Sequence, residues 1–116
     1  MSTTVRTPEE VFGHHAQALM AEKLDDIIAD YSNDAILIVQ KKVYRGHDGV
    51  RQVFTQLLSD VPQAQWSVET VWADDVLYLE WTARSASTHV DDGIDTFVFR
   101  DGMIQVQTVR YSLQGN

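Results

Sequence analysis

One carboxylate lies in a segment where strand alternation places it among aromatic side chains. Within GIDTFVFRDG, residues 93–102, Asp95 alternates with Phe97 and Phe99. Alternate side chains of a β-strand share one face of a sheet, so the acid should face apolar company. A carboxylate taken out of water costs several kcal/mol unless it is paired or protonated, and burial raises its pKa. Asp95 is therefore a candidate general acid and base, although an inward-pointing acid can also be purely structural.

His15 is the second residue that could move a proton. It lies four residues from both Val11 and Leu19, on the apolar stripe of a predicted helix, so its ring should point inward. An aspartate and a histidine within reach of each other can share a proton near neutral pH. Two interpretations stay open here: a catalytic pair of Asp95 and His15, and a core histidine satisfied by a buried acid.

Large aromatic side chains recur at positions that should face inward. They could line a hydrophobic cavity, or they could belong to an ordinary core, which is the commoner use of such residues. The candidates for substrate binding are Tyr31, Phe54, Trp81 and Phe97.

Composition excludes several kinds of chemistry. The chain has no cysteine, which removes disulfides, thiolate nucleophiles and cysteine metal sites. The four histidines and the scattered acids lack the tight spacing of zinc motifs, and no serine lies in a strained glycine-bounded turn. We therefore expect no metal and no cofactor.

The charge balance argues against nucleic acid as a partner. Nine Lys and Arg residues stand against seventeen Asp and Glu residues, and the formal net charge of −8 would repel a phosphate backbone. The basic cluster of Lys41, Lys42 and Arg45 is interpreted as a solvated turn, because no glycine-rich phosphate loop accompanies it.

Length and hydropathy predict one domain over residues 1–116. A hydrophobic fraction of 44% and a charged fraction of 22% are typical of globular proteins. No apolar run approaches the roughly 18 residues that a membrane span needs. The N-terminus MSTTVRTPEE also lacks the basic and then apolar order of a signal peptide. We expect no membrane association and a location in the cytoplasm.

Three helices are expected in the first half of the chain. Thr7, Pro8 and Glu10 form a capping box and a proline start for the first helix. A third helix should follow the breaker cluster at residues 46–49, with apolar positions from Val50 to Leu58. The second helix is predicted from spacings of three and four residues, at Leu24, Ile27, Ile28 and Tyr31.

Strands fill the rest of the chain. After a break at Asn33 and Asp34, residues 35–39 predict a buried strand, with a turn through Lys41 and Lys42 behind it. From residue 65 the period changes to two, which predicts a four-stranded antiparallel meander. Its expected turns lie at residues 74–75, 91–93 and 101–102, and its last strand at residues 103–113. The class is α+β, with three helices packed on one face of a curved, mainly antiparallel sheet.

Three blocks of the sequence together resemble a known superfamily. They are LMAEKLDDIIADYSNDAILIV, YRGHDGVRQVF and GIDTFVFRDGMI, at residues 19–39, 44–54 and 93–104. They resemble the cone-shaped α+β barrels of the nuclear transport factor 2-like superfamily, which includes ketosteroid isomerases and SnoaL-like polyketide cyclases. The resemblance specifies fold better than function, because members of this superfamily include both enzymes and plain binding proteins.

The resemblance also assigns roles to individual positions. The ketosteroid isomerase pattern places an oxyanion-hole tyrosine at His15, a general base at Val39 and a protonated aspartate at Asp95. Of these residue types only the last is present, so we expect no steroid isomerisation. The SnoaL-like cyclases resemble the chain better, since they rely on one aspartate at the position of Asp95.

Two functions follow as hypotheses. The first is a SnoaL-like enzyme that binds a small hydrophobic carbonyl compound, with proton transfer by Asp95 and with His15 orienting or polarising the substrate oxygen. The second is a non-catalytic module for ligand binding or dimerisation, which Val39 in place of a base favours. A homodimer is expected through the outer face of the meander, where Val76 and Tyr78 should be exposed and Gln105 and Gln107 should temper the patch.

Overall fold

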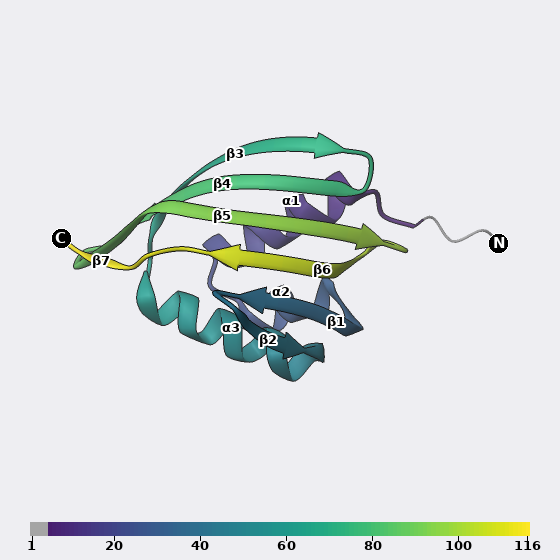
Figure 1. Ribbon diagram of the computed structural model, residues 1–116, viewed down its shortest axis with the longest axis horizontal. Coiled ribbons are helices and arrows are strands. Elements are labelled where there is room, and N and C mark those ends of the chain that lie inside the picture. The colour runs from purple at the N-terminus through teal and green to yellow at the C-terminus, as the bar shows by residue number, and fades with distance from the viewer. Residues whose placement is uncertain (1–4) are drawn as a thin grey trace.

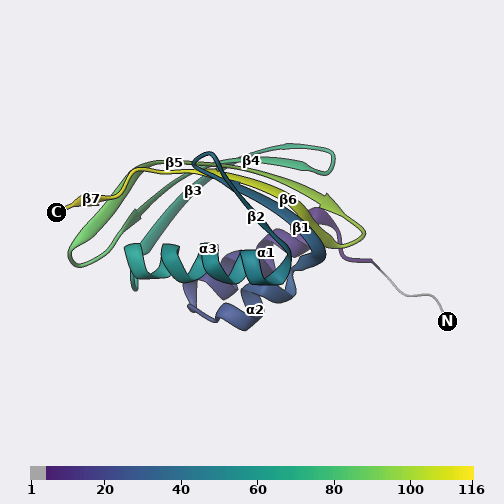
Figure 2. The ribbon, with the colours of Figure 1, turned by 60° about the horizontal axis from the view of Figure 1, so that its bottom comes forward.

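Three helices lie on the concave side of a curved sheet in the computed structural model of the chain, which describes residues 5–116 (Figure 1 and Figure 2). This arrangement confirms the predicted α+β class. The helices are α1 (Pro8–Met20), α2 (Leu24–Ala29) and α3 (Gly46–Asp60). The strands are β1 (Tyr31–Val39), β2 (Lys42–Arg45), β3 (Gln65–Ala73), β4 (Val76–Arg84), β5 (Thr88–Arg100), β6 (Met103–Arg110) and β7 (Gln114–Gly115).

The sheet runs in the order β2-β1-β6-β5-β4-β3, with β7 paired to β5. The meander from β3 to β6 is antiparallel, as predicted. The parallel pairing of β1 with β6 was not expected from the sequence. It joins the strand after the second helix to the end of the meander, so one continuous concave surface faces the helices (Figure 2).

A capping box and two contacts of Asp30 hold α1 in place. The predicted capping box is confirmed: the Thr7 hydroxyl accepts a hydrogen bond from the Glu10 amide at 3.1 Å, and the Glu10 carboxylate accepts one from the Thr7 amide at 2.8 Å. The buried carboxylate of Asp30 adds tertiary contacts, to Arg6 at 2.9 Å and to a ring nitrogen of His14 at 2.7 Å. These contacts tie the start of α1 and its His14 to the end of α2.

The predicted C-terminal end of the second helix is wrong. Helix α2 ends at Ala29, and Tyr31 begins β1 although it continues the helical spacing. The reason is tertiary: the Ile104 amide donates to the carbonyl of Asp30 at 2.8 Å, and a His47 ring nitrogen lies 2.8 Å from the carbonyl of Tyr31. Asn33 and Asp34, expected to break a helix, lie inside β1.

The segment between β1 and α3 also differs from expectation. The turn is centred on Gln40 and Lys41, both with positive φ, and Lys42 already belongs to strand β2. Helix α3 begins at Gly46, within the residues interpreted as a breaker cluster. Two-residue hairpin turns with positive φ at both central residues match the twist of the strands, which accounts for the conformation of Gln40 and Lys41 although neither is a glycine.

The expected turn at residues 91–93 is wrong. Strand β5 continues through these residues, with a register shift against β4 between Val90 and Gly93, and the chain reverses instead at residues 85–87. Gly93 lies opposite Trp81 of β4, so its role is in packing rather than in chain reversal. The last long strand, β6, ends at Arg110 and not at residue 113.

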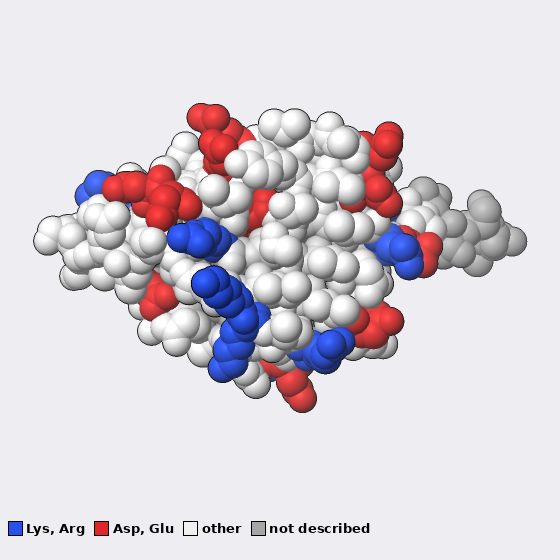
Figure 3. Space-filling view, in the orientation of Figure 1, with Lys and Arg blue, Asp and Glu red and all other residues white. Residues whose placement is uncertain are grey.

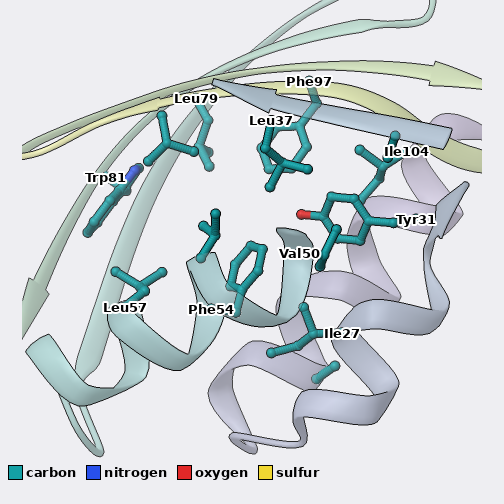
Figure 4. Close-up of a cluster of buried hydrophobic side chains, with 14 of the residues drawn as sticks. Ile27, Tyr31, Leu37, Val50, Phe54, Leu57, Leu79, Trp81, Phe97 and Ile104 are labelled. Carbon is teal, nitrogen blue, oxygen red and sulfur yellow. The ribbon is translucent and has the colours of Figure 1, made fainter. Parts of the chain in front are cut away.

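Alternation along β4 sets the two faces of the sheet. Leu77, Leu79 and Trp81 are buried, while Val76 and Tyr78 are more than a third exposed, as predicted. Figure 4 shows Leu79, Trp81 and Phe97 pointing from the sheet toward Phe54 and Leu57 of α3. The core therefore lies between the concave face and the helices.

Within residues 5–116, no helix is long and apolar enough to cross a bilayer.

Candidate active site

A cavity of about 710 Å³ lies between the concave face of the sheet and the helices. This volume falls in the range of small-molecule binding sites. The walls are mostly apolar and come from both layers, with Val39, Leu79, Trp81, Phe97 and Val109 from the sheet and Phe12, Leu19, Val53, Phe54 and Leu57 from the helices.

Asp95 places its carboxyl group against this cavity. The side chain is 6% exposed, and its strand alternation with Phe97 and Phe99, both buried, is as predicted. One carboxyl oxygen accepts a hydrogen bond from the Trp81 indole at 3.0 Å, and the other accepts one from the Gln107 amide at 2.9 Å. Burial raises the pKa of Asp95 to about 7, and the two hydrogen bonds offset only part of that rise.

The hydrogen-bond network continues behind Asp95. The Tyr31 hydroxyl donates to the side-chain carbonyl of Gln107, and both residues are buried. Burial, with the charges of Asp95 and Asp30, holds the pKa of Tyr31 well above its usual value, so its hydroxyl stays protonated and can donate. Tyr31 therefore orients the Gln107 amide, whose NH₂ group then points to the carboxyl group of Asp95.

Gln107 lies on the inner face of the sheet and not, as was predicted, on the outer face. It was expected outside with Gln105, but it is 1% exposed and lines the cavity. The pairing of β5 with β6 shifts register between Val98 and Phe99, whose partners are Val106 and Ile104. The extra residue in β6 changes the parity, so Ile104 and Gln107 both face inward. Nothing in the local sequence of β6 marks this bulge.

His15 is buried in an aromatic environment on the helical side of the cavity. Its ring lies 5.5 to 5.8 Å from the ring centroids of Tyr31, Phe54 and Phe97. Burial lowers its pKa to about 4, despite an opposing effect of the Asp30 charge, so the imidazole is neutral near pH 7. Its Nδ1 atom is enclosed and has no hydrogen-bond partner within residues 5–116.

The structure brings most of the predicted site residues together. Asp95, His15, Phe54, Trp81 and Phe97 all line the cavity. No hydrogen bond or ion pair joins Asp95 to His15 in the described part of the chain; the partners of Asp95 are Trp81 and Gln107. Tyr31, the remaining candidate for substrate binding, is not among the residues that line the cavity; it is fully buried, and its hydroxyl donates to Gln107 of the cavity wall.

A glycine that sequence reasoning assigned to a turn positions Trp81. Gly93 lies directly across from Trp81 in the neighbouring strand. A Cβ atom at Gly93 would lie 2.2 Å from the indole carbons, far inside van der Waals contact. The indole therefore packs over the bare backbone of Gly93, and this placement lets its N–H reach Asp95.

Comparison with known proteins identifies the family of this chain. The sequence profile of the SnoaL-like domain matches residues 12–107. The chain belongs to the SnoaL-like domain family. Its fold is that of the nuclear transport factor 2-like superfamily, which confirms the resemblance found in the sequence. No curated protein sequence matches this chain at a significant level.

The solved structures that resemble this chain share little sequence identity with it. IdmH of Streptomyces antibioticus, a proposed polyketide cyclase, is 13% identical with a TM-score of 0.73, and the match covers 92% of this chain and 93% of IdmH. A proposed ketosteroid isomerase from Kribbella flavida is 10% identical with a TM-score of 0.74, covering 90% and 77%. An NTF2-like protein of unknown function from Burkholderia xenovorans is 19% identical with a TM-score of 0.73, covering 90% and 82%.

Among residues 5–116 of the chain, no group of three or more acidic or histidine side chains is arranged to hold a metal ion. The polar groups at the deep end of the cavity are instead a carboxyl, an amide, an indole and an imidazole. Such a set can donate and accept hydrogen bonds and can exchange one proton near neutral pH.

The raised pKa of Asp95 predicts a pH-dependent stability difference between Asp95→Asn and the wild type. The folded state holds the Asp95 proton up to a pH of about 7, whereas the unfolded state releases it near 3.8. The contribution of Asp95 to the stability of the wild type therefore falls as the pH rises from about 4 to about 7, and the asparagine variant has no such contribution. His15 affects both proteins alike. The difference in unfolding free energy should change by up to about 4 kcal/mol in favour of the variant. Urea unfolding between pH 4 and 8 measures it, and parallel pH profiles would contradict the raised pKa.

Gly93→Ala should displace Trp81 and disturb Asp95. The new methyl group cannot fit beside the indole, so we expect a loss of about 1 to 3 kcal/mol in unfolding free energy and a shifted indole N–H signal in the NMR spectrum. Gly13→Ala is the matched control, since no atom lies within 4 Å of a Cβ placed there. If the Trp81 signal stays in place in Gly93→Ala, the positioning role of Gly93 is wrong.

Proposed function

We propose that this SnoaL-like domain is an acid–base enzyme that acts on a small hydrophobic carbonyl compound without a cofactor. The observation that carries the proposal is a carboxyl group with a pKa of about 7 on the wall of an apolar cavity of about 710 Å³. A general acid or base works best when its pKa lies near the working pH. Asp95 meets that condition at neutral pH.

The proposed chemistry uses one proton and one carboxyl group. The ionised Asp95 takes a proton from a carbon next to the substrate carbonyl, and the electron pair of that C–H bond moves to form an enolate. The protonated Asp95 then returns the proton to another carbon, which gives an isomer, or the enolate carbon attacks a second carbonyl, which closes a ring. In the ring closure, Asp95 gives its proton to the new alkoxide, so the carboxylate is regenerated in either case.

His15 is the proposed partner of the substrate oxygen. A neutral imidazole carries one N–H donor and one acceptor nitrogen. His15 lines the cavity, is neutral near pH 7 and makes no hydrogen bond within residues 5–116 that would occupy it. One hydrogen bond from its N–H would stabilise the enolate oxygen, and the low polarity of the cavity strengthens such a bond.

The second candidate function is ligand binding without catalysis. Val39 lines the cavity at the position that the isomerase resemblance assigns to a general base. Its side chain cannot take a proton, so Asp95 would have to perform both transfers alone. A cavity that only holds a hydrophobic molecule would need neither proton transfer.

Proton exchange into 2-tetralone separates the two candidates. This ketone is hydrophobic and has acidic protons next to its carbonyl, so deuterium uptake from D₂O, followed by NMR, reports proton abstraction without knowledge of the natural substrate. We expect the wild type to accelerate uptake and Asp95→Asn to lose about 100-fold or more of that acceleration. Asp91→Asn is the control, because Asp91 is an exposed acid on the same strand. Binding of 2-tetralone with no acceleration would favour the non-catalytic function.

We also propose a homodimer through the outer face of the sheet. Figure 3 shows this face with a broad uncharged area between the charged groups. Exposed apolar side chains on it are Ile38, Val43, Val71, Val76, Tyr78 and Ile94. Exposed apolar side chains that gather on one face favour an interface, and a twofold partner would cover them with the same surface. The cytoplasm stays the predicted compartment, since a chain without cysteine suits a reducing environment.

Two valines of β3 test the dimer. Val71 is 64% exposed on the outer face, and Val68 is 51% exposed on the inner face beside the cavity. Light scattering should give about twice 13.2 kDa for the wild type. Val71→Lys should weaken the dimer by about tenfold or more, and Val68→Lys should leave it intact. A wild-type mass near 13.2 kDa at micromolar concentration would contradict the dimer.

A further inference from the structure

We propose that the ligand of the cavity is amphipathic, with an anionic group such as a carboxylate that binds Lys42. This inference rests on the proposed function, since it takes the cavity as a small-molecule site with Asp95 at its reactive end. It adds the charge of the ligand and the orientation in which the ligand binds. Sequence reasoning placed Lys42 in a solvated turn; the residue is exposed, as expected, and it also lines the cavity.

Lys42 lies in one row with Asp95 across the concave face. Lys42 pairs with Val39, Val39 pairs with Val109, and Val109 pairs with Asp95. All four residues line the cavity. The row crosses three strand spacings, so the backbones of its two ends lie roughly 14 Å apart. A charged group at one end and a proton-transfer group at the other are therefore separated by two apolar side chains.

No carboxylate among residues 5–116 forms an ion pair with Lys42. Lys42 is the one Lys or Arg among the described residues that line the cavity. Its ammonium group lies 5.2 Å from the ring centroid of Tyr44, which also lines the cavity. The other charged group nearby, Asp60, accepts hydrogen bonds at both oxygens, from Gln56 and Tyr111.

The backbone beside Lys42 is held in a costly conformation. Gln40 and Lys41 have φ values of 50° and 76°, a region that costs a residue with a side chain roughly 1 kcal/mol or more. The turn is fixed to the C-terminal segment, because the Gln40 amide donates to the Val109 carbonyl at 3.1 Å and the Gln40 side chain donates to the Tyr111 carbonyl. These contacts hold the start of β2, and with it Lys42, at the cavity.

A net charge of −8 makes this lysine informative about the ligand. The protein as a whole repels anions, so an anionic ligand needs a local cation to bind. Lys42 supplies that cation, and its placement opposite Asp95 would direct the uncharged carbonyl end of the ligand toward the acid.

Two fluorescent probes that differ in one charged group test the inference. The anionic probe is 1-anilinonaphthalene-8-sulfonate and the neutral probe is N-phenyl-1-naphthylamine. We expect the wild type to prefer the anionic probe and Lys42→Gln to weaken its binding by about threefold to tenfold, with no change for the neutral probe. Lys41→Gln removes the adjacent charge, which does not line the cavity, and should leave both affinities unchanged. The Trp81 indole N–H signal reports whether each probe enters the cavity.

Each outcome has a separate meaning. If both probes shift the Trp81 signal but Lys42→Gln leaves their affinity ratio unchanged, the anion subsite is wrong and the proposed function stands. The same holds if Lys41→Gln has as large an effect as Lys42→Gln. If neither probe shifts the Trp81 signal, the cavity does not take hydrophobic molecules, and the subsite and the proposed function are both wrong.

Discussion

The burial of the Asp95 carboxyl group against an apolar cavity is the constraint on which the site depends. Its two hydrogen-bond donors, from Trp81 and Gln107, are both neutral. Neutral donors stabilise a carboxylate less than a paired cation does, so they hold the group in place without keeping it ionised. A pKa of about 7 follows from this balance. A lysine or arginine in either position would instead fix the charge and remove the acid function.

Each donor depends in turn on a residue from another element. The indole of Trp81 packs where Gly93 has no side chain, and the amide of Gln107 is oriented by Tyr31. Tyr31 is the first residue of β1, which reaches the site through its parallel pairing with β6. Positioning one carboxyl group therefore involves four neighbouring strands of the sheet, β1, β6, β5 and β4.

The parts of the site that depend on local pattern could be predicted from the sequence. Strand alternation placed Asp95 on the inner face, and helical spacing turned His15 inward, because neither element is interrupted near these residues. Gln107 was misplaced because a bulge in β6 changes the parity, and a bulge has no local signature there. Gly93 was assigned to a turn because glycine favours turns, whereas the reason for it is an indole on the adjacent strand. Lys42 is exposed, as expected of a solvated turn, but its position beside the cavity could not be predicted, because it depends on a hairpin turn formed without glycine.

The titration of the Asp95 carboxyl carbon by NMR tests the account most directly. Asp95→Asn identifies the resonance by its loss from the spectrum. The account predicts a midpoint near pH 7, well above the ordinary value of 3.8 for an aspartate. A midpoint near 4 would mean that the carboxyl is stabilised as an anion in the folded protein, and the acid–base role of Asp95 would then be contradicted.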